Sequence, residues 1–335
     1  MATIKDVAKE AGVSQGTITR YFNNESLKEE NRKRIEEAVI KLDYKVNTVA
    51  RSLRSKKSYS IGVIVTSFKN QFISSILTAI ENYFIDKGYS IIVCTSMDDY
   101  KIERKKLEFL VEKRIDGLII IPTKGVKNSM DILKSLEEKN IPIVTVDNFI
   151  DDLKCSSVMV DNINGTYAAA EHLVTNGHKR IGIITGPDDY ATSIERLRGF
   201  KRALSDFNLS ADHELIKQGG YTVNNGYDAM RYFSEMQLPP TAILATSYDL
   251  TLGALLYITE KSLQIPDDFS FLGFDAEEFS KIMKPQISVV LQPLTEIGQK
   301  AAEVMYKHLK DEDYSFDIFR LKTKMIVTSS IKKLN

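Results

Sequence analysis

Residues 3–24 read Thr-Ile-Lys-Asp-Val-Ala-Lys-Glu-Ala-Gly-Val-Ser-Gln-Gly-Thr-Ile-Thr-Arg-Tyr-Phe-Asn-Asn and contain two short helical patterns separated by a glycine. Apolar residues recur at helical spacing over residues 4–11 and predict a first amphipathic helix. Thr3 and Asp6 are spaced as a capping box at its start, and Gly12 is suited to end it.

A second helix is predicted over residues 15–23, with Ser14 as its N-cap. The small Ala8 lets the two helices approach each other, and Ile18 fills the angle between them. Two short helices joined by a glycine-containing turn form a helix-turn-helix, a unit that can place a helix in the major groove of DNA. By spacing alone, a generic helical hairpin with a polar outer face explains the pattern about equally well.

A third helix is predicted to close a small three-helix core, with Ser26 as its cap and Glu29 three residues later. Its apolar stripe consists of Ile35, Ala38, Val39 and Leu42. This N-terminal part is basic: residues 1–58 hold 13 Lys and Arg against 8 Asp and Glu, although the whole chain has 45 of each. A basic head on an acidic body is the charge distribution expected if the head alone meets phosphates.

The length of 335 residues exceeds what one hydrophobic core usually supports, so several domains are expected. Two cysteines, Cys94 and Cys155, make a disulfide framework improbable and favour a reducing compartment. Cys94 lies in an apolar run and is expected to be a buried structural thiol. The sequence has neither a signal-peptide pattern nor an apolar run of about 18 residues, so a cytoplasmic protein without a membrane partner is expected.

Residues 3–24 are similar to the N-terminus of the lactose/galactose repressor family of bacterial transcription regulators. The resemblance implies that the second helix lies in the major groove of double-stranded DNA, where Gln15, Gly16 and Arg20 read bases. Arg20 is suited to a bidentate contact with guanine. Gly16 departs from the family pattern, because many relatives carry a longer side chain there. The other predicted DNA contacts of the head are Thr3, Ser14, Thr17, Thr19 and Asn23.

Residues 47–58 resemble the hinge helix and linker of the same family. A helix this short, capped by Asn47, is marginal in water unless something holds it. The resemblance implies that it pairs with its twin across a homodimer and inserts Leu53 into the minor groove, with Ala50 and Arg51 beside it. The expected DNA target is a pseudo-palindromic operator.

From Ser60 onward, short apolar runs alternate with amphipathic helical stretches, a pattern that predicts α/β domains with parallel sheets. The predicted strands are residues 61–65, 91–93, 118–121, 143–146, 158–160, 181–184, 243–245 and 269–272. The resemblance implies two doubly wound lobes of the periplasmic-binding-protein type I architecture, with crossings near Asp161, Val290 and Phe319. The predicted domains are a head (1–46), a hinge and linker (47–58) and an effector-binding and dimerisation part (59–335), divided into an N-terminal lobe (59–160, 291–318) and a C-terminal lobe (161–290, 319–335).

Polar residues at the carboxyl ends of parallel strands predict where a ligand binds. Asp147 and Asp275 each end a predicted strand. The resemblance adds Arg196 for a ligand hydroxyl or carboxylate, Tyr221 for stacking, and Phe72 as an apolar wall. Each of these residues alone could be structural, whereas together they favour an effector site between the lobes.

Ser247 is also assigned to this site, although it departs from the family pattern. Most sugar-sensing relatives have asparagine there, followed by the aspartate that this chain places one residue later, at Asp249. The missing amide makes a simple pyranose less favoured than a bulkier, phosphorylated or acidic ligand.

An enzyme is the main alternative from another class, but the chain lacks the nucleotide-binding glycine loops and the nucleophile elbow of doubly wound enzymes. No cofactor or metal is expected, because the four histidines have no partners at metal-binding spacing. The expected function is a repressor of a carbohydrate-utilisation operon, released by a sugar or sugar derivative. A family member activated by a corepressor or a partner protein stays open as the alternative.

Overall fold

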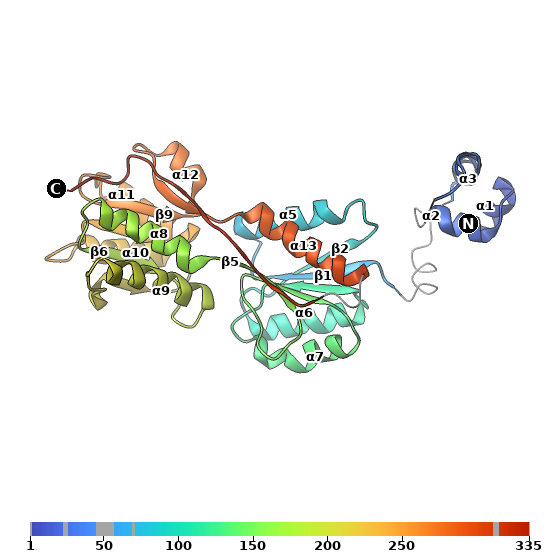
Figure 1. The fold of residues 1–335 in the computed structure, drawn as a ribbon, viewed down its shortest axis with the longest axis horizontal. Coiled ribbons are helices and arrows are strands. Elements are labelled where there is room, and N and C mark those ends of the chain that lie inside the picture. Colours follow the sequence, from blue (N-terminus) through green and yellow to red (C-terminus); the bar gives the residue numbers. More distant parts are fainter. Residues whose placement is uncertain (1, 23–25, 45–56, 69–70, 311–314, 335) are drawn as a thin grey trace. The chain divides into compact units, whose positions relative to one another are not determined.

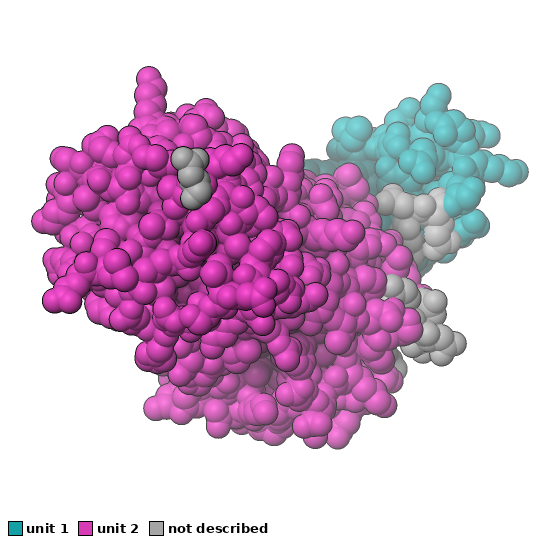
Figure 2. All heavy atoms as spheres, turned by 60° about the vertical axis from the view of Figure 1, so that its left-hand side comes forward, with its two compact units in different colours: residues 1–58 teal, residues 59–335 magenta. Residues whose placement is uncertain are grey.

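The computed structural model describes residues 2–22, 26–44, 57–68, 71–310 and 315–334. The chain divides into two compact units, residues 1–58 and residues 59–335, which Figure 2 distinguishes by colour. Among the described residues, no helix is long and apolar enough to cross a membrane.

The described part of the first unit is a three-helix bundle of α1 (Ile4–Ala11), α2 (Gln15–Phe22) and α3 (Glu29–Lys41). The predicted capping box is confirmed: the Thr3 backbone N–H donates to Asp6 Oδ2 over 2.8 Å, and Thr3 Oγ1 accepts from the Asp6 N–H. Gly12 ends α1 in the left-handed region with a φ of 61°, as a tight turn requires. The core of the bundle consists of Val7, Ala8, Ala11, Ile18, Ile35 and Ala38.

The prediction that Ser26 caps the third helix is wrong. α3 begins at Glu29, and Lys28 occupies the N-cap position without a side-chain hydrogen bond. Glu29 and Glu30 lie in the first turn, where acidic side chains complement the helix dipole. The Ser26 carbonyl oxygen accepts a hydrogen bond from Arg20 Nη2 over 2.9 Å.

In the second unit, the described strands form two six-stranded sheets, each covered by helices as the sequence predicts (Figure 1). The first sheet is parallel and has the order β11-β5-β4-β3-β1-β2. Its elements are β1 (Ser60–Val65), α5 (Gln71–Phe84), β2 (Ser90–Thr95), α6 (Tyr100–Glu112), β3 (Gly117–Ile120), η1 (Val126–Ser129), α7 (Met130–Glu138), β4 (Ile143–Val146), β5 (Ser156–Val160), α13 (Leu294–Lys310) and β11 (Ile318–Leu321). Helices α5 and α13 pack side by side in this lobe.

The second sheet has the order β12-β10-β9-β8-β6-β7, with β12 antiparallel to β10. Its elements are α8 (Asn162–Thr175), β6 (Ile181–Thr185), α9 (Ala191–Asp206), η2 (His213–Leu215), β7 (Ile216–Gln218), α10 (Val223–Ser234), β8 (Ala242–Ala245), α11 (Tyr248–Glu260), β9 (Ser270–Phe274), α12 (Glu277–Ile282), β10 (Ser288–Leu291) and β12 (Lys324–Ile326). The two sheets define a first lobe and a second lobe, and these names are used below.

The chain passes between the lobes after β5, after β10, and between β11 and β12. Strand β11 pairs with β5 as far as Leu321, so the third crossing comes after Leu321 and later than the crossing predicted near Phe319. Cys94 is buried, as predicted, and burial raises the pKa of its thiol.

Helix α11 is held against α10 by a close approach of backbones in the second lobe. A Cβ atom on Gly253 would lie 1.9 Å from the Val223 carbonyl oxygen, and one on Gly226 would lie 2.3 Å from the Leu250 carbonyl oxygen. Glycine is therefore required at both positions. The approach also fixes the N-terminus of α11, which follows Ser247.

Replacing Gly253 by alanine is expected to lower the free energy of unfolding by about 1–3 kcal/mol, because the added methyl must displace the backbone of α10. Leu256→Ala on the same helix removes a side chain that is 48% exposed, and it should change stability by less than about 0.5 kcal/mol. Denaturant unfolding of both variants measures the difference. If Gly253→Ala instead raised the free energy of unfolding by the roughly 1 kcal/mol by which a helix favours alanine over glycine, the close approach would be refuted.

Candidate ligand cleft and DNA-reading head

A cavity of about 820 Å³ in the second unit is lined by residues of both lobes. The six ligand residues predicted from the sequence, which come from six different segments, all line it. They are Phe72, Asp147, Arg196, Tyr221, Ser247 and Asp275. The structure thus brings the predicted set together at the carboxyl ends of the strands, where open parallel sheets bind ligands.

Asp147 and Asp275 follow β4 and β9 and adopt left-handed φ angles of 68° and 56°. Asp275 Oδ1 accepts from the Gln292 backbone N–H over 3.0 Å, and Asp275 Oδ2 accepts from the Gln292 side-chain amide. Asp147 Oδ1 is buried and has no hydrogen-bond partner among the described residues. The Asp275 carboxylate therefore has hydrogen-bond donors for both of its oxygens, whereas the Asp147 carboxylate has a buried oxygen without a donor in the described part of the chain.

The buried position of these carboxylates shifts their titration. Burial raises the pKa of Asp147 to about 6, with Asp275 adding to the shift and Arg196 opposing it. Burial also raises the pKa of Asp275, against the stabilising effects of Arg196 and Gln292. Both acids are harder to ionise here than in water, because the charged form loses its hydration.

Arg196 of α9 is only 5% exposed. Its Nε donates to Asn162 Oδ1 over 2.8 Å, and its Nη1 donates to the Thr246 carbonyl oxygen over 2.6 Å. The guanidinium carbon lies 4.5 Å from the centre of the Phe274 ring. Arg196 is therefore a buried charge held in place by three segments of the second lobe.

Tyr221 and Ser247 have structural partners as well as a place at the cavity. The Tyr221 hydroxyl lies 2.7 Å from Ser193 Oγ and 3.3 Å from Thr192 Oγ1. Ser247 caps α11, because its Oγ accepts from the Leu250 backbone N–H over 3.3 Å. Ser247 consequently has a capping role that the sequence comparison with sugar-sensing relatives could not reveal.

Two polar contacts join loops of the two lobes. The Tyr190 hydroxyl of the second lobe donates to Asp98 Oδ2 of the first lobe over 2.6 Å. Burial, together with this hydrogen bond, raises the pKa of Tyr190. Lys124 of the first lobe forms an ion pair with Asp189 of the second. Both contacts come from loops that follow strands of the first lobe or precede α9, so they join the lobes away from the three chain crossings.

Among the polar residues that line the cavity, sequence reasoning did not assign Asp98, Tyr190, Asp249 and Gln292 to the site. Gln292 directly follows β10, a strand that was not predicted although a crossing was expected near Val290. Asp249 lies in the first turn of α11, one position beyond the place where relatives carry their aspartate. The rule that ligands bind after strands would have found Gln292 once β10 was recognised.

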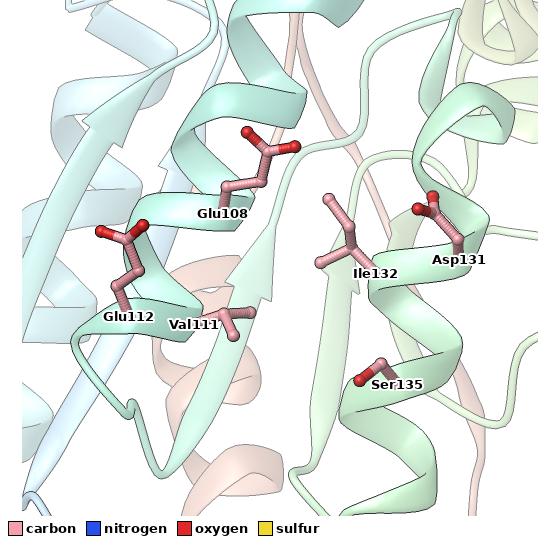
Figure 3. Close-up of a pocket in the computed structure, with 6 residues that line it drawn as sticks. All are labelled: Glu108, Val111, Glu112, Asp131, Ile132 and Ser135. Atoms are coloured by element: carbon pink, nitrogen blue, oxygen red, sulfur yellow. The ribbon is translucent and has the colours of Figure 1, made fainter.

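A second, smaller cavity of about 400 Å³ lies between α6 and α7 (Figure 3). It is lined by Glu108, Val111, Glu112, Asp131, Ile132 and Ser135. All of these belong to the first lobe. The described residues contain no group of three or more His, Cys, Asp or Glu side chains that could hold a metal ion.

In the first unit, the predicted DNA-contact residues lie at the start of α2 and along it. Ser14 Oγ accepts from the Thr17 backbone N–H over 3.1 Å, which confirms Ser14 as the N-cap. The Thr19 hydroxyl donates to the Gln15 carbonyl oxygen over 3.0 Å. Thr3, Ser14, Gln15, Gly16, Thr19 and Arg20 are exposed, and Thr17 is half-buried. The predicted contacts Asn23, Asn47, Ala50, Arg51 and Leu53 lie outside the described residues.

An exposed helix-turn-helix unit, joined in one chain to a two-lobed α/β unit with a polar cleft, defines a DNA-binding transcription regulator with a sensor domain. Two family models match the chain. Residues 3–47 match the model of bacterial regulatory proteins of the lacI family, and residues 58–324 match the model of periplasmic binding proteins and the sugar-binding domain of the LacI family. The chain belongs to the LacI family, whose members are transcription regulators and not enzymes.

Individual relatives agree with this assignment and confirm the predicted family and fold class. The chain is 33% identical to an HTH-type transcriptional repressor PurR of Aliivibrio salmonicida strain LFI1238, over 100% of both chains. A Lac repressor dimer, solved with operator and the anti-inducer ONPF, is 25% identical with a TM-score of 0.83, over 99% of both chains. A putative ribose operon repressor from Burkholderia thailandensis is 30% identical with a TM-score of 0.73, over 81% of this chain and 99% of that one.

The titration of Asp147 should be measurable as a pH-dependent stability. Its folded-state pKa of about 6 lies above the ordinary value of 3.8, so the folded protein binds this proton more tightly than the unfolded chain does. The free energy of unfolding should therefore fall as the pH rises through the interval between these two pKa values. Asp147→Asn removes the free-energy cost of ionising this buried carboxyl. We expect the variant to be more stable than the parent by about 1–3 kcal/mol at pH 8 and by much less at pH 4.5.

Denaturant unfolding of the two proteins across this pH range tests the expectation. Asp86→Asn, which alters an exposed carboxylate outside the cavity, is the control and should show no such dependence. A stability difference between Asp147→Asn and the parent that stayed constant with pH would contradict the raised pKa.

Proposed function

We propose that this chain is a repressor that binds a pseudo-palindromic operator as a homodimer and releases it when a small molecule occupies the cleft between the lobes. The observation that carries the proposal is the cavity of about 820 Å³, in which six residues predicted from the sequence meet from both lobes. The proposed effector residues are Phe72, Asp147, Arg196, Tyr221, Ser247 and Asp275. A sugar or sugar derivative is the proposed effector class, and the cytoplasm is where such a repressor would meet its operator.

The proposed DNA contacts follow the sequence assignment. In the head they are Thr3, Ser14, Gln15, Gly16, Thr17, Thr19, Arg20 and Asn23. In the hinge they are Asn47, Ala50, Arg51 and Leu53. Relatives support this part of the proposal, since the similar Lac repressor structure is a dimer bound to its operator. The head is taken as residues 1–46, and the hinge and linker as residues 47–58.

The proposed switch uses the connection between the linker and the first lobe. The linker continues directly into β1, which begins at Ser60 and lies in the first sheet. Rotation of the first lobe against the second would therefore displace the linker of each subunit and change the spacing of the paired hinges. Near the crossings, Arg320 of β11 forms an ion pair with Glu195 of α9 at 3.0 Å, which joins the lobes there while the cleft opens or closes.

The proposal is tested by selecting genomic DNA fragments with the purified full-length chain at physiological salt. The selection is repeated with sugars, sugar acids, sugar phosphates and amino sugars. Recovery of a pseudo-palindrome, lost when one compound is added, supports the proposal. Recovery that requires a compound would instead favour a corepressor-dependent regulator. Salt-sensitive binding without sequence preference would contradict a specific repressor.

Arg20→Lys should lower affinity for the selected operator by about 1–3 kcal/mol, because lysine keeps the charge but cannot make a bidentate contact with guanine. The loss should be confined to one base position of each half-site. Lys33→Gln removes an exposed charge on α3 and serves as the control, for which any weakening should be similar across all sequences. Equal losses on operator and random DNA for Arg20→Lys would rule out base reading by this residue.

A further inference from the structure

We propose that the effector is a polyhydroxylated molecule that carries a protonated amine, such as an amino sugar. The inference rests on the proposed role of the cleft as the effector site, and it specifies the chemistry of the molecule bound there. Three observations carry it: the charge of the cavity wall, the partners of its arginine, and two buried acceptors that lack donors.

The wall of the cavity is acidic. Four carboxylates line it, from Asp98, Asp147, Asp249 and Asp275. Arg196 is the sole cation among the described lining residues, so four carboxylates and one guanidinium give a formal charge of −3 when all are ionised. In a partly enclosed cavity such charges act more strongly than at an open surface, because less water screens them.

Arg196 is poorly suited to bind an anionic ligand. Two of its donors already bond Asn162 and Thr246, and its face lies over Phe274. Burial raises the pKa of Asp147 and Asp275, and the Arg196 charge opposes this rise in both, so two carboxylates already offset part of its charge. A phosphate or carboxylate entering the cavity would add a negative charge without finding an uncompensated cation.

Two acceptors on residues that line the cavity have no donor among the described residues. Gln292 is 8% exposed, and its Oε1 has no hydrogen-bond partner among the described residues. Its amide nitrogen donates to Asp275, which fixes the orientation of the side chain. Asp147 Oδ1 is likewise buried without a partner. Since an unsatisfied buried acceptor is costly, a ligand with hydroxyl or N–H donors would be favoured over one that offers only acceptors.

An ammonium group on the ligand would offset the negative charge of the cavity, which hydroxyl groups alone would not do. Burial raises the pKa of Asp147, Asp249 and Asp275, so their charged forms are already penalised before a ligand excludes more water. A neutral ligand would increase that penalty, whereas a cation offsets it by direct attraction. Aromatic side chains, including Phe72 and Tyr221, also line the cavity and suit both a sugar ring and a cation.

This chemistry differs from the expectation drawn from the sequence. The serine at position 247 favoured a bulkier, phosphorylated or acidic ligand, because the amide that most sugar-sensing relatives carry there is missing. The assembled cavity adds Asp98 and Asp249, and their charges oppose an anion.

Calorimetric titration of the full-length chain with matched compounds tests the inference. The probes are glucosamine, galactosamine and mannosamine, each compared with its parent hexose, the hexose 6-phosphate and the hexuronic acid. We expect at least one amino sugar to bind about tenfold or more tightly than its parent hexose, with affinity falling as salt rises. Tighter binding of a parent hexose, a phosphate or an acid, or failure of every amine to bind, would overturn the inference.

Asp249→Asn provides a test in the protein. This carboxylate lies in the first turn of α11, and its replacement by an amide of equal size should weaken binding of the amino sugar by about tenfold and leave the parent hexose unaffected. Asp86→Asn, on an exposed site outside the cavity, should change neither affinity. Equal losses for the amine and the hexose would count against a charge-specific role.

Operator binding measured in the same titrations separates this inference from the proposed function. If an amino sugar binds as expected but leaves operator affinity unchanged, the amine inference stands and the proposed switch fails. If a sugar phosphate or acid releases the operator, the proposed switch stands and the amine inference fails.

Discussion

The cleft depends on the burial of one permanent charge. Arg196 is 5% exposed, and a guanidinium removed from water must be stabilised by the protein. Asn162 at the start of α8, the Thr246 carbonyl after β8, and the Phe274 ring at the end of β9 supply that environment within the second lobe. The polar ends of these segments therefore converge on one point, which is also the wall of the cavity.

The same charge links the lobes. Asp147 belongs to the first lobe, and burial raises its pKa to about 6. Arg196 opposes this rise and Asp275 adds to it, and both of these residues belong to the second lobe. The attraction between Asp147 and Arg196 therefore favours closure, while burial of the two acids opposes it. Because these contributions oppose each other, the preferred position of the lobes can change when a ligand supplies hydrogen-bond donors and a positive charge to the cavity. The contacts of Tyr190 with Asp98 and of Lys124 with Asp189 also join the two lobes.

The fold was predicted well where hydrophobic patterns are long and buried. Strands β1, β4 and β6 appear close to their predicted bounds, because continuous apolar runs identify strands buried on both faces. Strands β7, β11 and β12 have three or four residues and no fully buried position, so no such pattern marks them. Ser26 failed as a helix cap because the Ser-x-x-Glu spacing also occurs where a helix begins later, at Glu29.

Only part of the site was predicted, because a site residue is found most easily where the strand before it has a clear apolar pattern. Asp147 and Asp275 directly follow strands that the sequence reveals, and Arg196 was found through its family motif. Gln292 was missed because it follows an unpredicted strand, and Asp98 because it lies three residues beyond β2. The charge of the cavity depends on how these separate segments assemble. No single stretch of sequence contains that information.

Reciprocity between the two binding sites tests the account most directly. A ligand that changes operator affinity by some factor must have its own affinity changed by operator DNA by the same factor. Titrating the cleft ligand into the full-length protein with and without saturating operator measures this. We predict that operator weakens ligand binding by the factor by which the ligand weakens operator binding. Ligand affinity that is identical with and without operator would contradict the coupling of cleft and DNA-reading head.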